Sequence, residues 1–140
     1  MAAWYPNVER WRAGYFYPAI GGLLADPDGD GVKNIVEFAF NLNPKATSLA
    51  TLQPGSGTSG LPSVARNGGG SLTIEFIRRR ADALPGIIYA AEFASSPAGP
   101  WTAATVETST IIDATFERVA VIDPAPAPNR FTRVRLTTSP

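Results

Sequence analysis

Four acidic side chains between residues 26 and 37 are spaced in a way that could hold a metal ion. Asp26, Asp28 and Asp30 alternate along the chain. Gly31 stands where a loop wrapped around an ion must turn sharply, and Glu37 can give two carboxylate oxygens at once. Calcium is a hard cation that takes about six to eight oxygen ligands, many of them from one wrapping loop. These residues therefore predict a calcium site.

The positions between the acids complete the ligand pattern. With Asp26 as the first of twelve positions, Val32 is seventh and offers its backbone carbonyl, while Asn34 is ninth. This order matches the EF-hand calcium loop. A solvated acidic turn would explain the Asp-Gly pairs, but it would not explain the placement of Glu37. The predicted ligand set is Asp26, Asp28, Asp30, Val32, Asn34 and Glu37.

Composition narrows the classes of function. The 140 residues contain 12 acidic and 12 basic side chains, no cysteine and no histidine. Disulfides and thiolate metal sites are excluded, and histidine, the commonest general base, is absent. The chain is only mildly basic outside the loop, which is too little to indicate nucleic-acid binding. No nucleophile elbow, phosphate loop or dinucleotide fingerprint occurs, so we expect no enzyme activity.

A helical segment is expected to carry the calcium loop. Trp4, Val8, Trp11 and Tyr15 share one helical face. Pro18 and the following glycines disfavour a long helix entering the loop. Ile35, Ala39 and Leu42 share one face and favour an exit helix that stops at 43–44. A single loop with no partner loop indicates a permanently filled, structural site. Residues 1–44 are therefore predicted as a helical segment with one EF-hand-like loop.

The rest of the chain changes to a period of two. Residues 45–60 are rich in Ser, Thr, Gly and Pro and are predicted as a linker or long loop. Strands are expected over 61–66, 71–77, 87–94, 101–106, 110–112, 116–122 and 130–136. Short strands separated by frequent turns are typical of an antiparallel sandwich. The predicted fold is mainly β: an antiparallel β-sandwich over 61–140 with a small N-terminal helical calcium-loop segment.

The order of these pieces resembles a known kind of module. It comprises an aromatic helix, the segment 25–44, Gly60-Leu61-Pro62, then 72–79, 88–92, Trp101 and 130–136. This resembles C-terminal modules of large secreted or surface proteins of environmental bacteria, Verrucomicrobia especially. The acidic loop is also similar to dockerin and thrombospondin type 3 calcium repeats, although dockerins carry two loops. The resemblance implies a non-catalytic, calcium-stabilised, extracellular module.

Two groups of side chains are candidate ligand contacts. Trp4, Trp11 and Trp101 could stack on sugar rings, or they could be packing surface. Arg78, Arg79 and Arg80, together with Arg133 and Arg135, could bind acidic polysaccharide or a cell surface, because a guanidinium donates two bonds to one carboxylate or sulfate. The alternative for the arginines is charge protection of an exposed strand edge.

The expected role is a non-catalytic structural or adhesive module, acting in attachment, sorting or self-assembly. A carbohydrate-binding module that uses exposed aromatics and arginines is the alternative. A single weak calcium loop suits an extracellular or cell-surface location. Residues 1–4 have no basic, apolar leader, so we expect a mature piece or an excised module, with no transmembrane segment. Expected partners are Ca²⁺ and either other copies of the chain or surface polysaccharide.

Overall fold

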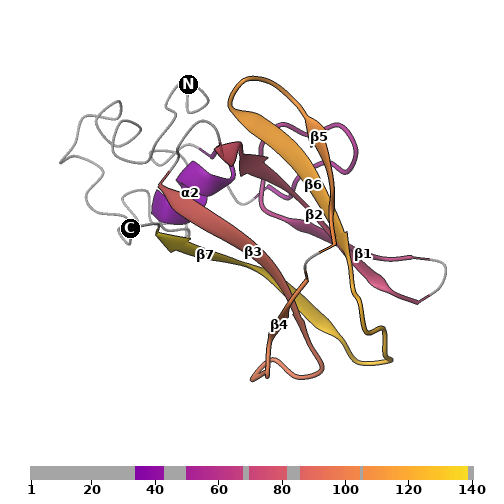
Figure 1. The fold of residues 1–140 in the computed structure, drawn as a ribbon. Helices are drawn as coiled ribbons and strands as arrows, with labels where there is room; N and C mark the ends of the chain where they lie inside the picture. Colours follow the sequence, from indigo (N-terminus) through magenta and orange to yellow (C-terminus); the bar gives the residue numbers. More distant parts are fainter. Residues whose placement is uncertain (1–33, 43–49, 68–69, 82–85, 105, 139–140) are drawn as a thin grey trace.

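Two antiparallel sheets form the body of the protein. The computed structural model describes residues 34–42, 50–67, 70–81, 86–104 and 106–138 (Figure 1). The elements in these ranges are α2 (Asn34–Ala39), β1 (Ser63–Arg66), β2 (Leu72–Arg79), β3 (Ile87–Ala94), β4 (Thr102–Ala103), β5 (Thr108–Ile111), β6 (Phe116–Ile122) and β7 (Phe131–Thr138). One sheet has the order β1-β2-β6-β5 and the other β4-β3-β7. The mainly β, antiparallel fold predicted from the sequence is confirmed.

The space between the sheets is filled by alternate residues of the long strands. Ile74 and Phe76 of β2 pair with Val121 and Val119 of β6, and these four side chains are at most 1% exposed. From the second sheet Tyr89 stacks on Phe76 with ring centroids 6.2 Å apart. The period of two in the sequence thus marks the residues that face the opposite sheet.

The other face of β2 is also covered. Ile77 is fully buried and Arg79 is 1% exposed, although both point away from the second sheet. Phe38 of α2 lies against this face, where the Arg79 guanidinium stacks on its ring. Further along the same face, Glu75 accepts a bond from the Gly55 amide at 2.6 Å. This sheet is therefore covered by the second sheet on one side and by Phe38 and Gly55 on the other.

Residues 50–60 lie within the predicted linker, but they are packed against the sandwich. Leu52 is 1% exposed, and its amide donates to Leu61 at 2.8 Å. Gly60 adopts a φ of 135°, and a Cβ there would lie 2.6 Å from the Leu52 nitrogen. This close approach requires glycine. The segment is irregular in backbone, as expected of a loop, yet it contributes to the core.

Three elements are shorter than predicted: α2, β4 and β1, which begins at Ser63 instead of residue 61. α2 ends at Ala39, because Asn41 takes a left-handed conformation (φ 60°) and the Leu42 amide bonds the Glu37 carbonyl at 2.7 Å, a common helix stop. β4 covers two residues of the expected 101–106. The chain crosses there from one sheet to the other to begin β5, which ends the pairing.

Replacing Leu52 by alanine tests whether the 50–60 segment is part of the core. We expect Leu52→Ala to lower the free energy of unfolding by about 2–5 kcal/mol, as for other buried leucines. Val106, 83% exposed, gives the matched control: Val106→Ala should change it by less than about 0.5 kcal/mol. Equal urea midpoints for the two variants would show that the segment is a dispensable spacer.

Candidate functional site

The predicted metal ligands fall partly within the described chain. Asp26, Asp28, Asp30 and Val32 lie outside the described residues, while Asn34 begins α2 and Glu37 lies in its first turn. The Glu37 side chain is 0% exposed. A carboxylate is very rarely buried unless it is paired or coordinates a metal ion. In the predicted ligand pattern this residue is the twelfth, the closing carboxylate.

Within the described ranges, no group of three or more carboxylates, His or Cys is arranged to hold a metal ion. Three of the four predicted carboxylate ligands precede residue 34. Glu37 is thus the part of the predicted site whose surroundings can be described, and those surroundings link α2 to the sandwich.

Arg79, at the end of β2, holds the helix in place. Its Nε donates to the Phe38 carbonyl oxygen at 2.9 Å. Its guanidinium lies 3.8 Å from the centroid of the Phe38 ring and 4.7 Å from that of Phe116. The carbonyls of a helix's last turn have no partner within the helix, so this bond supplies one. The charge is buried between two aromatic faces, where cation–π attraction is strongest.

Tyr89 of β3 makes the second connection between α2 and the sandwich. Its hydroxyl donates to the Ala39 carbonyl at 2.7 Å and accepts the Arg79 amide at 3.2 Å. Burial raises the pKa of Tyr89 above its ordinary value, so the hydroxyl keeps the proton it donates. The ring also meets Phe40 edge-on at 6.1 Å. Two strands from different sheets therefore bind consecutive carbonyls, those of residues 38 and 39, directly after Glu37.

The three consecutive arginines do not form one cationic patch. Arg79 points to the face opposite to Arg78 and is buried. Arg78 binds two carboxylates, Glu117 at 2.8 Å and Glu107 at 2.6 Å. Arg80 donates to the backbone oxygen of Asp113 at 3.1 Å. The guanidinium groups of these three arginines therefore bond other parts of the protein.

The predicted aromatic contacts are likewise divided. Trp4 and Trp11 lie outside the described residues. Trp101 is half-buried, and the Arg133 guanidinium lies 4.1 Å from its ring centroid. Arg133 is held there by Glu92 at 2.8 Å. One face of the Trp101 ring is thus covered by a side chain of β7.

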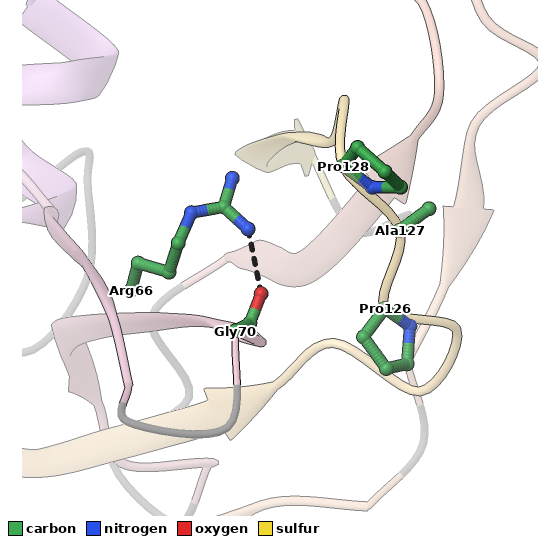
Figure 2. A pocket seen from close by; sticks show the side chains of 5 residues that line it. All are labelled: Arg66, Gly70, Pro126, Ala127 and Pro128. Atoms are coloured by element: carbon green, nitrogen blue, oxygen red, sulfur yellow. Dashed lines mark hydrogen bonds between the residues drawn. The ribbon is translucent and has the colours of Figure 1, made fainter.

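A pocket that the sequence analysis did not anticipate lies between the β1–β2 turn and the proline-rich loop. It has a volume of about 350 Å³ and is lined by Arg66, Gly70, Pro126, Ala127 and Pro128. Figure 2 shows the Arg66 guanidinium on one side, bonded to the Gly70 carbonyl, and the two proline rings on the other. The proline-rich loop has prolines at 124, 126 and 128, but nothing in the sequence indicates that an arginine lies opposite it.

The proline-rich loop, residues 124–128, is held in place by the ion pair between Asp123 and Arg130 at its two ends. Asp123 is 3% exposed and receives two bonds from Arg130, at 2.7 and 2.9 Å. It also accepts the Ala125 amide at 3.0 Å, and Arg130 reaches Ser95 at 2.9 Å. Hydrogen bonds from Arg130 hold the pKa of the Asp123 carboxyl below its ordinary value of 3.8. The pocket wall is therefore preorganised.

Removing the Arg79 charge should loosen α2. Arg79→Met keeps the length of the side chain but leaves the Phe38 carbonyl without this donor, so we expect a loss of about 1–3 kcal/mol in unfolding free energy. Arg135, exposed on β7, supplies the control, and Arg135→Met should be near neutral in the same urea titration. If both variants unfold at the wild-type midpoint, Arg79 does not anchor the helix.

The Asp123–Arg130 pair should appear in the pH dependence of stability. Because the folded-state pKa of Asp123 is depressed, its contribution is present above the unfolded value of 3.8 and is lost as pH falls through the folded pKa. We expect Asp123→Asn and Arg130→Met to be less stable at neutral pH and to lose less stability below about pH 4. Urea titrations across this range make the comparison, and curves parallel to wild type would contradict it.

Comparisons of the chain with protein-family models, with curated proteins and with solved structures gave no match.

Proposed function

We propose that the chain is a non-catalytic structural or adhesive module that works outside the cell and is stabilised by calcium bound at residues 26–37. The observation that carries the proposal is the position of Glu37. The twelfth residue of the ligand pattern is fully buried in the first turn of a helix whose next two carbonyls are bonded by Arg79 and Tyr89.

Calcium would act on the whole sandwich through this connection. The ion would neutralise the three aspartates and Glu37 and would fix the start of α2. Phe38, Ala39 and Phe40 follow at once and belong to the core, with exposures of 0%, 0% and 3%. Binding to the folded state alone stabilises that state, so the free energy of calcium binding would be expressed as stability of the sandwich. The site would serve as a staple for a small domain.

The surroundings of the acidic residues support a structural role. Glu92, Glu107, Glu117 and Asp123 each bond an arginine at 2.6–2.8 Å. Carboxylates with such partners hold strands and loops together. A pair arranged for glycoside cleavage would instead face a substrate cleft from its two sides.

The extracellular location rests on the type of loop. A single EF-hand-like loop has no partner to raise its affinity, and loops that bind weakly stay filled where calcium is abundant. Among the described residues no helix is long and apolar enough to cross a bilayer. The carbohydrate-binding alternative has less support, because Arg78, Arg79 and the described tryptophan all contact other parts of the protein.

Thermal melting in millimolar calcium and in excess EDTA tests the staple. We expect calcium to raise Tm by several degrees, since a site filled to about 100 times its Kd adds about 2.7 kcal/mol. The change should involve the entire sandwich in one transition. Glu37→Gln and Asp30→Asn, which keep side-chain size and remove charge, should each abolish most of the calcium-induced shift.

Glu107→Gln is the control, because Glu107 is an acid of the sandwich bonded to Arg78. Its calcium-induced shift should equal that of wild type, whatever its absolute Tm. A melt of the wild-type chain that is identical in calcium and EDTA would refute the proposal. A shift retained in both loop variants would place the ion elsewhere.

A further inference from the structure

The two sheets of the described chain are unequal in width. The order β1-β2-β6-β5 faces the order β4-β3-β7, and across the sandwich β2 contacts β7. β6 is covered, since Val119 and Val121 are at most 1% exposed. β1 therefore extends past β7 and lies opposite no other strand of the described residues. We call the space beside β7 and opposite β1 the open side.

Val64 on β1 shows that the open side is uncovered. It pairs directly with Ile74, so both side chains point toward the second sheet. Ile74 is 1% exposed, whereas Val64 is 52% exposed. An inward-facing valine on a sandwich strand is normally buried, and here no strand of the described residues covers it.

Among the described residues β7 pairs with β3 alone, so its other edge borders the open side; α2 also contacts β7. Val134 and Leu136 face inward opposite Ala91 and Tyr89, yet both are only partly buried. β7 has eight residues, while the other three edge strands, β1, β4 and β5, have four, two and four. Proteins usually keep edge strands short, because a long edge offers a row of unpaired amides and carbonyls to another strand.

The side chains of β7 define what could pair with it. Arg133 and Arg135 alternate with Val134 and Leu136 and point to the outer face. Arg133 forms an ion pair with Glu92, whereas Arg135 bonds no carboxylate within the described chain. In a strand added along β7, every second side chain would lie beside Arg133 and Arg135 on the outer face. The side chains between them would point inward, next to Val134 and Leu136 and opposite Val64.

We propose that the open side binds an extended segment of a partner protein in which acidic and apolar residues alternate, added as a strand along β7. The acidic residues would face Arg133 and Arg135, and the apolar ones would complete the core. A second copy of this chain is a poorer occupant, because antiparallel pairing about Val134 would set Arg133 of one copy opposite Arg135 of the other, and like charges in such pairs repel.

The pocket described above lies at one end of this path. Arg66 pairs with Leu72 and so points to the same side as Val64. Pro126 and Pro128 lie in the loop that leads to β7 and face Arg66 across the pocket (Figure 2). A further carboxylate of the partner, either a side chain or a chain terminus, would meet the Arg66 guanidinium there, between walls that Asp123 and Arg130 hold in place.

This inference specifies the kind of partner for the adhesive role proposed above. Its evidence comes from the two sheets and does not depend on calcium binding. The calcium melt and a peptide-binding measurement therefore fail independently. The probe is a fluorescent synthetic peptide of alternating Glu and Val with the length of β7, titrated with the intact chain in calcium. We expect saturable binding, with slower amide exchange along β7.

Two comparisons make the test specific. An alternating Lys–Val peptide should bind at least about tenfold more weakly, and Arg135→Glu should reverse this preference. The Glu–Val peptide methylated on alternate backbone nitrogens should not bind, because it cannot form the ladder. Val64→Glu should weaken binding, whereas Ile111→Glu, an exposed position on the opposite edge strand β5, should leave it unchanged.

Several results would overturn the proposal. They are the absence of saturable binding, equal affinity for the acidic and basic peptides, or insensitivity to both Arg135→Glu and Val64→Glu in variants that melt as the wild type does. Concentration-dependent dimers that protect β7 amides and are not displaced by the Glu–Val peptide would identify a second copy as the occupant and would also reject it.

Discussion

The packing of α2 against the β-sandwich depends on the buried guanidinium of Arg79. Arg79 is the last residue of the central strand β2, and its guanidinium lies between the rings of Phe38 and Phe116. It also donates a hydrogen bond to the backbone carbonyl of Phe38 in α2. Leaving a charge in such a place without partners would cost several kcal/mol, so the aromatic residues and the helix end must be present for β2 to fold as it does. The helical segment and the sandwich therefore stabilise each other.

This mutual dependence explains why β2 is buried on both faces. Its first half alternates as a strand with one covered face, and its second half adds Ile77 and Arg79 on the other side. Strands buried on both faces are typical of sheets covered by helices, and here α2 and the packed loop at 50–60 provide the cover. Tyr89 reaches the same helix end from the second sheet. Residues on both sheets thus meet at the turn that follows Glu37.

The alternation of apolar and polar residues was enough to predict most strands. It could not predict which side chains contact one another between strands and helix. β3 and β6 begin and end where alternation in the sequence places them, since each has one face on the core. The burial of Arg79 contradicts the usual behaviour of an arginine triplet and depends on Phe38, forty-one residues earlier. The exposure of Val64 depends on sheet order, which no local pattern encodes. The calcium ligands before residue 34 stay a prediction.

The arginines of β7 have two consequences that follow from one physical fact. Outward charges on an edge strand discourage pairing with an identical strand, because like charges meet across the new ladder. The same charges favour a strand of opposite charge, so protection against self-association and selection of a partner are one property. Val64, Val134 and Leu136 supply the gain in burial that makes such a partner stable. In the described residues four strands face three, and the proposed partner strand would complete the smaller sheet.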